Sequence, residues 1–453
     1  MKNKLLYILL CFNAFIYSCK KMDGFTSSGV EIIIPTGNEK YLNQNSDSIF
    51  NQNNLPIIEI NLPENALKYI NSNPAAEEYV EGSLSYNGET ISPIGIRYKG
   101  SIGAFVGGVS GNDWSNPSGH KTATKLSMKF KIDWKGYNTT FYNLKTLQLH
   151  SMNLDKSQLH DRLGYWLYRE MGVPAPRSIH AKLYINGVYN GLFSMVEQID
   201  EQFTSFNFSD GSGNLYKEVW PLNSNGEVQS DKKLYQGLIT NKIAGVNNHI
   251  IKQFAQNIIN TTDDNTLLNT LNTHMNIDQT IALAVVDRAI RNDDGPFHWY
   301  CGLFGCEPHN FFWYENPSSN KVHLIPWDLD NAFENIISNV NSVTPIKDSW
   351  GDTSNNCQSF AYGDMGIEQK SAACDKIIGG LAKNMLKYQQ LKDSLISGPM
   401  SQAIVDAKID EWVNQIINAT IEANQIHNDA ISIAEWQNEI IELKNQLEYA
   451  RTH

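Results

Sequence analysis

The sequence predicts an α+β fold whose first part is rich in β-strands and whose second part is mostly helical. Residues 55–200 contain short alternating apolar segments separated by turn residues, a pattern typical of strands. Residues 201–453 contain longer segments with apolar residues at helical spacing. One β-hairpin, residues 309–330, is expected within the helical part. The length of 453 residues is ample for two or three structural units.

The N-terminal segment has the features of a bacterial export signal. Residues 1–4 supply two lysines, and the apolar run that follows, of about 13 residues, is shorter than the roughly 20 that a membrane-spanning helix needs. The run ends in Ile16-Tyr17-Ser18-Cys19, which resembles a lipobox. We therefore expect residues 1–18 to be removed and Cys19 to carry a lipid that anchors the exported protein to the outer membrane or the cell surface. The alternative is an ordinary cleaved signal followed by an incidental cysteine.

The segment after the signal is predicted to be a flexible tether. Residues 19–54 are rich in Ser, Asn, Gly and Gln and contain one short apolar patch. The formal charge of −12 becomes −14 when residues 1–18 are removed, because they contain two lysines and no acidic residue. A protein this acidic is a poor partner for nucleic acid, so none is expected.

Four cysteines remain after the signal segment and Cys19. Thiols in an oxidising compartment suggest two disulfides, and proximity in the sequence favours Cys301 with Cys306 and Cys357 with Cys374. Four cysteines nevertheless allow three connectivities. A zinc site is the alternative, although the spacing matches no finger or ribbon pattern.

A loop bearing several glycines follows the strand predicted at residues 94–99. Glycine permits positive φ and close approach of the backbone, as phosphate-binding loops require, and a flexible surface loop is the alternative. The next predicted strand, residues 125–131, begins at Lys125, and its lysines could equally form a solvated face. A helix at residues 155–172 and two strands joined by Asn186-Gly187, a strong hairpin signal, complete the β-rich part.

The hairpin at residues 309–330 is the most informative segment. Asn310 begins its first strand and Asp328 ends its second, so the two side chains are expected at the same open end. Asp330 lies two positions after Asp328, which on an extended chain places both carboxylates on one face. Carboxylate and amide oxygens suit Mg²⁺, so the sequence predicts a metal site here. The alternative is a structural Asn with structural or capping aspartates.

Two further carboxylates enter the same end from the preceding helix. Either Asp293 or Asp294 could accept a proton from an attacking hydroxyl group. Asp294 is preferred because it directly precedes the turn at Gly295.

Taken together, these segments resemble the CotH kinase-like family, which is called after spore-coat protein H. The most specific matches are Pro326-Trp327-Asp328-Leu329-Asp330 and the Asn186-Gly187 hairpin that ends at Glu197-Gln198-Ile199-Asp200. The resemblance covers roughly residues 55 to 450. It implies an atypical, bilobal, protein-kinase-like fold with a β-rich N-lobe and a mostly helical C-lobe, and it implies ATP and Mg²⁺ (or Mn²⁺) as cofactors.

The resemblance also implies roles for individual residues. Asp294 would be the catalytic base. Asn310 and Asp328 would be metal ligands, and Asp330 would be a second ligand or an orienting group. Lys125 and Arg97 would bind the phosphates. Glu197 either contacts the nucleotide or anchors a turn. The acidic helix residue that pairs with the lysine in protein kinases is either Asp161 or Glu170. The insert at residues 297–308 departs from the family pattern and is expected to form a disulfide-closed loop that gates the site or selects substrate.

The expected activity is transfer of the γ-phosphate of ATP to hydroxyl groups of exported or surface proteins. The presence of Asp294, Asn310 and Asp328 together favours this activity. A non-catalytic surface-binding or adhesion module is one alternative, which the scarcity of ATP outside the cytoplasm favours. A kinase-like nucleotidyl or glutamyl transferase is the other.

Overall fold

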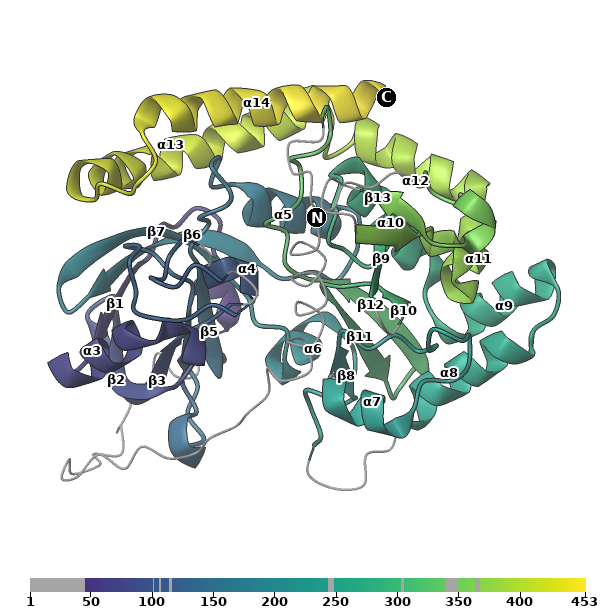
Figure 1. Ribbon diagram of the computed structural model, residues 1–453, viewed down its shortest axis with the longest axis horizontal. Coiled ribbons are helices and arrows are strands. Elements are labelled where there is room, and N and C mark those ends of the chain that lie inside the picture. The colour runs from purple at the N-terminus through teal and green to yellow at the C-terminus, as the bar shows by residue number, and fades with distance from the viewer. Residues whose placement is uncertain are drawn as a thin grey trace, which may run out of the picture. The chain divides into compact units, whose positions relative to one another are not determined.

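The computed structural model describes residues 45–453 except 101, 106, 114–115, 243–247, 303–304, 339–348 and 363–366. The predicted signal segment, Cys19 and most of the predicted tether therefore lie outside the described residues. The described chain mixes helices with sheets, as an α+β fold does (Figure 1). In this part of the chain, no helix is both long enough and apolar enough to cross a membrane.

The chain forms two compact units. Of the described residues, unit 1 contains those up to Gln158 together with Arg177–Gln198 and Glu411–Glu439, and unit 2 contains those within Leu159–Pro176, Ile199–Asp410 and Ile440–His453. The unit boundary after Gln198 lies beside the boundary predicted at residue 200. However, Leu159–Pro176 lies in the predicted first part but belongs to unit 2. Glu411–Glu439 lies in the predicted second part but belongs to unit 1.

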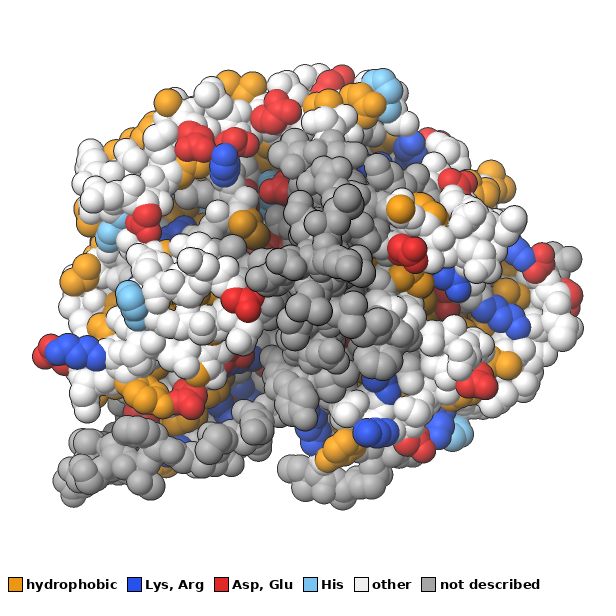
Figure 2. Space-filling model, in the orientation of Figure 1, with side chains coloured by type: hydrophobic (Ala, Val, Ile, Leu, Met, Phe, Trp, Pro, Cys, Tyr) orange, Lys and Arg blue, Asp and Glu red, His pale blue; other side chains and the backbone are white. Residues whose placement is uncertain are grey.

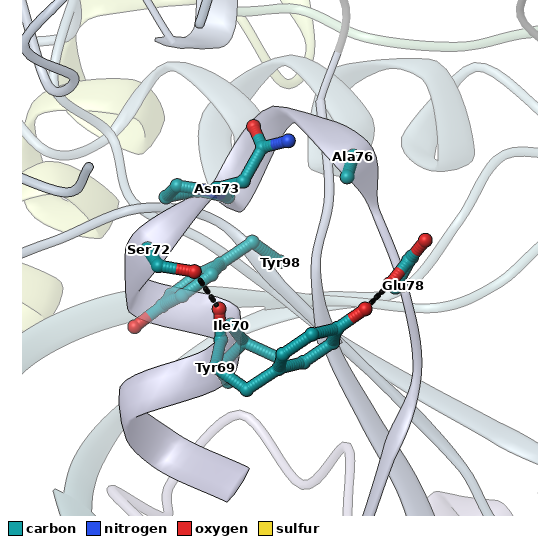
Figure 3. A pocket seen from close by; sticks show the side chains of 8 residues that line it. Tyr69, Ile70, Ser72, Asn73, Ala76, Glu78 and Tyr98 are labelled. Carbon is teal, nitrogen blue, oxygen red and sulfur yellow. Dashed lines mark hydrogen bonds between the residues drawn. The ribbon is translucent and has the colours of Figure 1, made fainter. Parts of the chain in front are cut away.

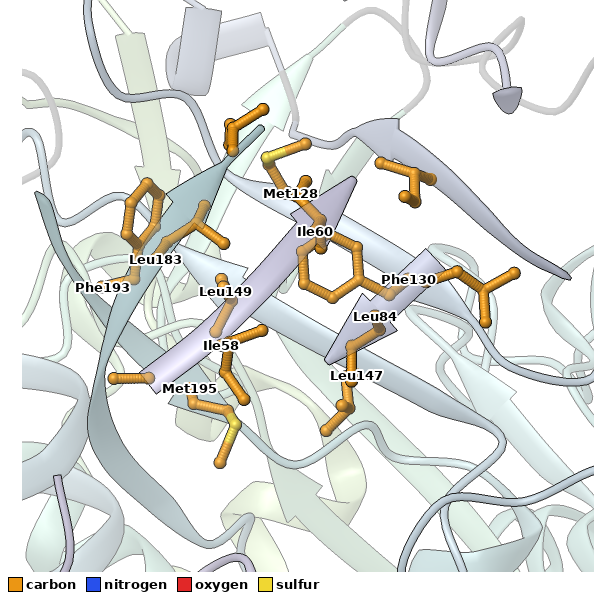
Figure 4. Packing of buried hydrophobic residues seen from close by; sticks show 14 of the residues in the cluster. Ile58, Ile60, Leu84, Met128, Phe130, Leu147, Leu149, Leu183, Phe193 and Met195 are labelled. Atoms are coloured by element: carbon orange, nitrogen blue, oxygen red, sulfur yellow. The ribbon is translucent and has the colours of Figure 1, made fainter. Parts of the chain in front are cut away.

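Unit 1 is built on a closed β-barrel with strand order β1-β2-β3-β4-β5-β7-β6. Its strands are β1 (Ile57–Asn61), β2 (Val80–Tyr86), β3 (Glu89–Tyr98), β4 (Met128–Lys131), β5 (Thr146–His150), β6 (Ser178–Ile185) and β7 (Val188–Val196). Neighbouring strands are antiparallel except β1 and β6, whose parallel pairing closes the barrel. Alternate side chains such as Ile58, Phe130 and Leu149 fill the interior (Figure 4). Closure leaves no unpaired sheet edge.

Short helical segments accompany the barrel, namely η1 (Ser46–Ser48), α3 (Glu64–Ser72), η2 (Pro74–Ala76), α4 (Ile102–Phe105) and η3 (Trp134–Gly136). The predicted hairpin at Asn186-Gly187 is confirmed between β6 and β7, where both residues have positive φ, 51° and 78°. The strand predicted at residues 125–131 was wrong at its start, because β4 begins at Met128. The carbonyl oxygen of Lys125 accepts a hydrogen bond from the Asn153 side chain, so the chain has not yet joined the sheet there.

Unit 2 combines helices with two small sheets. The helices are α5 (His160–Glu170), α6 (Glu201–Asn207), α7 (Asp231–Gly237), α8 (His249–Asn260), α9 (Asp264–His274), α10 (Ile277–Ala289), α11 (Lys376–Ala382) and α12 (Met385–Ser397). One sheet has the order β12-β11-β8, with β8 (Leu215–Lys217), β11 (Phe311–Asn316) and β12 (Lys321–Pro326). The other has the order β10-β9-β14-β13, with β9 (Trp299–Gly302), β10 (Gly305–Glu307), β13 (Phe360–Tyr362) and β14 (Ile367–Lys370). Helices α13 (Gln402–Ile426) and α14 (Ile433–Thr452) belong in part to each unit.

An aromatic cluster joins the two sheets of unit 2. The ring of Trp220 meets Trp299 of β9 edge-on at a centroid distance of 5.4 Å. It meets Phe311 and Trp313 of β11 in the same way, at 5.4 and 5.3 Å. Because edge-to-face aromatic pairs add to the stabilisation from burial, this cluster fixes β9 relative to the hairpin.

Two disulfides lie in unit 2. They join Cys301 to Cys306 and Cys357 to Cys374, which confirms the predicted pairing and rules out the zinc alternative. Disulfides persist in oxidising compartments, so they indicate an exported protein. On the face shown in Figure 2, the acidic and basic side chains of the described residues are interspersed rather than gathered by sign.

Candidate functional site

The open end of the β11–β12 hairpin brings the predicted metal ligands together. The two strands pair in the register Phe311↔Pro326 to Asn316↔Lys321, so the hairpin is found as predicted. Beyond the last pair, the backbone N–H of Trp327 donates to the carbonyl oxygen of Asn310 at 3.0 Å. Asn310 and Asp328 therefore leave the sheet at the same end.

The backbone at this end adopts an unusual conformation. Asn310 has φ 52° and Asp328 has φ 54°, values that Asn and Asp adopt more readily than other non-glycine residues and that often occur at functional sites. The expectation that Asp328 and Asp330 lie on one face of an extended chain was wrong, because β12 ends at Pro326 and Asp328 itself has a left-handed backbone. The hydroxyl oxygen of Tyr165 in α5 accepts a hydrogen bond from the N–H of Asp328 at 3.0 Å and supports this turn.

Asp294 lies against the same hairpin end. Its Oδ2 accepts a hydrogen bond from the Asn310 side-chain amide at 2.7 Å, and its Oδ1 accepts one from the Tyr300 hydroxyl. Burial, together with the nearby Asp328 and Glu218 carboxylates, raises the pKa of Asp294 to about 7 against the opposing effects of the hydrogen bonds from Tyr300 and Asn310. A half-buried carboxylate with a pKa near neutrality suits a general base.

Asp293 occupies a different environment from its neighbour. It is fully buried, and its carboxylate accepts a hydrogen bond from the Asn335 side-chain amide. Its backbone carbonyl group contacts the His298 ring. Asp293 therefore packs into unit 2, whereas Asp294 faces Asn310.

Asp330 lies in a concentration of negative charge. Burial raises its pKa well above the usual range, and the carboxylates of Asp328, Asp161, Asp294 and Glu334 raise it further. Mutual repulsion of this kind is relieved by a bound cation.

The donor set fits a magnesium ion shared with phosphate groups. Among the described residues, no three His, Cys, Asp or Glu side chains form a cluster that could hold a metal by themselves. Mg²⁺ is usually bound through one or two carboxylates together with substrate phosphates and water, rather than by a cage of protein ligands. Asp328, with the amide oxygen of Asn310 and Asp330 nearby, supplies ligands of this kind.

Lys125 and Arg97 belong to unit 1. The Lys125 ammonium donates to the carbonyl oxygen of Leu192 at 2.8 Å, and burial lowers its pKa to about 8. Arg97 forms an ion pair with Glu77 at 2.7 Å, and its guanidinium carbon lies 5.1 Å from the centre of the Tyr79 ring. Each cation thus has a defined partner within its own unit.

Glu197 is a buried ion-pair partner. It is 1% exposed, and its Oε2 accepts hydrogen bonds from the backbone N–H and the Nε of Arg177, both at 3.0 Å. The same guanidinium reaches Asp47 at 2.7 Å and Ser46 at 2.7 Å, so it links η1 to the barrel. Of the two roles considered for Glu197, nucleotide contact and anchoring of a turn, these contacts fit the anchoring role.

Three residues near the site were not anticipated from the sequence. Tyr165 supports Asp328, Tyr300 contacts Asp294, and Glu218 accepts a hydrogen bond from the N–H of Asn310 at 3.3 Å. Tyr300 could have been suspected because it directly precedes Cys301 in the insert. Nothing in the local sequence marks Glu218.

Unit 1 also contains a hollow whose lining includes none of the candidate site residues. It has a volume of about 160 Å³ and lies between α3, η2 and β3, with Tyr69, Glu78 and Tyr98 among its lining residues (Figure 3). Pockets for ligands of nucleotide size measure about 300–1,000 Å³, so this hollow is too small to be the nucleotide site.

Most of the chain matches a known protein family. The family described as CotH kinase protein matches residues 96–452, which include the hairpin, Asp294 and Lys125. The chain belongs to the CotH kinase family. This family indicates a kinase-like protein, for which ATP and a divalent metal ion are the suggested cofactors. The match begins within β3, so β1 and β2 precede the CotH segment. No curated protein matches the chain.

Asp287 of α10 is a fully buried carboxylate that predicts a pH-dependent stability. Burial raises the pKa of Asp287 from 3.8 to about 7, against the opposing effects of Arg288, Asn292 and Tyr168. Between these pKa values the folded state keeps a proton on Asp287 that the unfolded state releases. The stabilisation that comes from this proton is complete below about pH 4 and is lost as the pH rises through about 7.

When the pH is raised from about 5 to about 8, the titration of Asp287 should lower the unfolding free energy of the unsubstituted protein by about 2–3 kcal/mol. Asp287→Asn lacks this titration, so its unfolding free energy should fall by about 2–3 kcal/mol less over the same pH range. Urea unfolding at the two pH values checks this expectation. Equal losses in the two proteins would contradict it.

Proposed function

We propose that this protein is an exported kinase that transfers the γ-phosphate of ATP to hydroxyl groups of surface or exported proteins. The observation that carries the proposal is the meeting of Asp294, Asn310 and Asp328 at the open end of the β11–β12 hairpin. A base carboxylate, a metal-binding amide oxygen and a metal-binding carboxylate are the parts that protein kinases use for phosphoryl transfer.

Asn310 and Asp328 would hold the divalent metal ion, and Asp330 would complete or orient the set. The metal ion, when bound, neutralises charge on the phosphates and so lowers the barrier to transfer. The left-handed backbone at Asn310 and Asp328 sets the direction of both side chains before any ligand arrives.

Asp294 is proposed to accept the proton of the attacking hydroxyl group. Its oxygens are oriented by the Asn310 amide and the Tyr300 hydroxyl, so the carboxylate needs little rearrangement to receive a proton. Asp293 is not proposed for this role, since it is buried against Asn335.

Nucleotide phosphates are proposed to contact Lys125 and Arg97. Lys125 is the stronger candidate, because its hydrogen bond is to a neutral carbonyl oxygen, whereas Arg97 already pairs with Glu77. Binding of an anionic phosphate would raise the pKa of Lys125 and keep it protonated. We also propose that a lipid on Cys19 anchors the mature protein to the cell envelope.

Phosphoryl transfer is tested by incubating the mature chain with Mg²⁺ or Mn²⁺ and ATP labelled at the γ position, beside ATP labelled at the α position. The expected result is incorporation of γ label alone, and its loss in Asp328→Ala. Incorporation of α label would indicate nucleotidyl transfer instead. A protein that binds no ATP and incorporates neither label would support a non-catalytic surface module.

A further inference from the structure

The insert between Asp294 and Asn310 places a side chain on the proposed base. Strand β9 of the insert carries Tyr300, and the hydroxyl group of Tyr300 donates to Oδ1 of Asp294. The amide of Asn310 donates to Oδ2 at 2.7 Å. Each oxygen of the carboxylate is therefore oriented by one donor, the first from the insert and the second from the hairpin.

The ring of Tyr300 is fixed between two histidines. It stacks on His309 with centroids 4.2 Å apart and planes 6° apart. It also meets His298 edge-on at 5.6 Å. Because His309 directly precedes Asn310, the stacked pair ties β9 to the start of the metal-site hairpin.

Strand β9 is held on both of its edges. On one edge it pairs with β10, where Cys306 lies opposite Cys301 and is joined to it by a disulfide. On the other edge Tyr300 and its neighbours pair with β14. The residues after β14 lead to Cys374, which is joined to Cys357 by the second disulfide. The four strands of this sheet have only three or four residues each, so each pair contributes few backbone hydrogen bonds and the disulfides add restraint.

We propose that Tyr300 is a positioning residue for Asp294, and that the Cys301–Cys306 disulfide must be closed for Tyr300 to hold the carboxylate. Catalysis is then about tenfold faster in compartments where the thiols are oxidised than where they are reduced. The inference rests on the proposed function, because it takes Asp294 as the base. A disulfide restricts the open conformations of the segment that it closes, and its loss releases β9 together with Tyr300. Before export, in a reducing compartment with abundant ATP, the chain would lack the restraint.

Opening the disulfide is a balanced two-electron step. One disulfide takes up two electrons and two protons and gives two thiols. In the test these come from dithiothreitol, which is itself oxidised to its cyclic disulfide. Oxidation in the exported protein reverses the change.

The kinetic test compares Tyr300→Phe, the double variant Cys301→Ser/Cys306→Ser and the unsubstituted protein. Phenylalanine keeps the stacked ring and removes only the hydroxyl group. We expect Tyr300→Phe and the double cysteine variant each to lower kcat about tenfold, with the KM for ATP changed less than about twofold. Tyr388→Phe is the matched control, because Tyr388 also stacks on an aromatic ring, that of Trp350, and should keep full kcat.

Reduction distinguishes a positioning role from a general structural one. Dithiothreitol should lower kcat of the unsubstituted protein about tenfold but that of Tyr300→Phe less than about twofold, because the restraint acts through a hydroxyl group already removed. An equal effect of reduction on both proteins would overturn the inference, as would an unchanged kcat in Tyr300→Phe.

Hydrogen exchange keeps the inference separate from the proposed function. If the oxidised protein transfers no phosphate, the proposed activity fails, but the restraint can still be measured on the amides of residues 293–300. The expected result is faster exchange of these amides after reduction and in the double cysteine variant. Unchanged exchange in both cases would show that the disulfide does not hold the segment.

Discussion

Replacing Asp294 with asparagine is expected to lower kcat about a thousandfold while the KM for ATP changes less than about twofold. The amide has nearly the same shape as the carboxylate but cannot accept the proton of the attacking hydroxyl group. Steady-state kinetics with a protein acceptor measure both constants. A large rise in the KM for ATP with little change in kcat would contradict the base assignment, because it would place Asp294 in nucleotide binding.

Asp293→Asn is the matched control for this substitution. Asp293 is the adjacent carboxylate but is fully buried against Asn335, so its replacement should leave kcat within about threefold. A thousandfold loss in Asp293→Asn, with Asp294→Asn nearly unaffected, would exchange the roles assigned to the two residues.

Replacing Glu197 with glutamine is expected to cost about 3 kcal/mol of unfolding free energy. The substitution leaves the 3% exposed Arg177 without its buried counter-charge, and a lost partner for a buried charge is costly. Urea unfolding followed by tryptophan fluorescence measures this cost. A loss below about 1 kcal/mol with a weakened affinity for ATP would instead favour nucleotide contact by Glu197.

Asp47→Asn is the control for the ion pair of Arg177. Asp47 contacts the same guanidinium at 2.7 Å, but its side chain is 59% exposed. Exposed ion pairs contribute roughly 0–1 kcal/mol, so this substitution should have a small effect. If Asp47→Asn lowered the unfolding free energy as much as Glu197→Gln, burial would not explain the difference expected between these two partners of Arg177.

Local signals predicted the features that depend on neighbouring residues. Asn186-Gly187 predicted the β6–β7 hairpin because both residues adopt positive φ without large strain. The turn after Asn316 predicted the β11–β12 hairpin, and with it the shared end of Asn310 and Asp328. The disulfide pairing followed from proximity in the sequence.

Features set by distant contacts could not be predicted in this way. The parallel pairing of β1 with β6 joins segments far apart in the chain, so no local pattern revealed the closed barrel. Strands β9, β10, β13 and β14 have three or four residues each, too few to show a period of two. Tyr300 reaches Asp294 only because those strands form a sheet, and the support of Asp328 by Tyr165 depends on the packing of α5.

We propose that Asn310 and Asp328 hold a divalent metal ion together with the nucleotide, beside Asp294. Electron paramagnetic resonance of Mn²⁺, titrated into the protein with ADP, tests it most directly. We expect one tightly bound Mn²⁺ per chain in the presence of ADP, with binding weakened at least about tenfold in Asp328→Asn and in Asn310→Ala, and retained in Asp293→Asn. Unchanged Mn²⁺ binding in both Asp328→Asn and Asn310→Ala would contradict it.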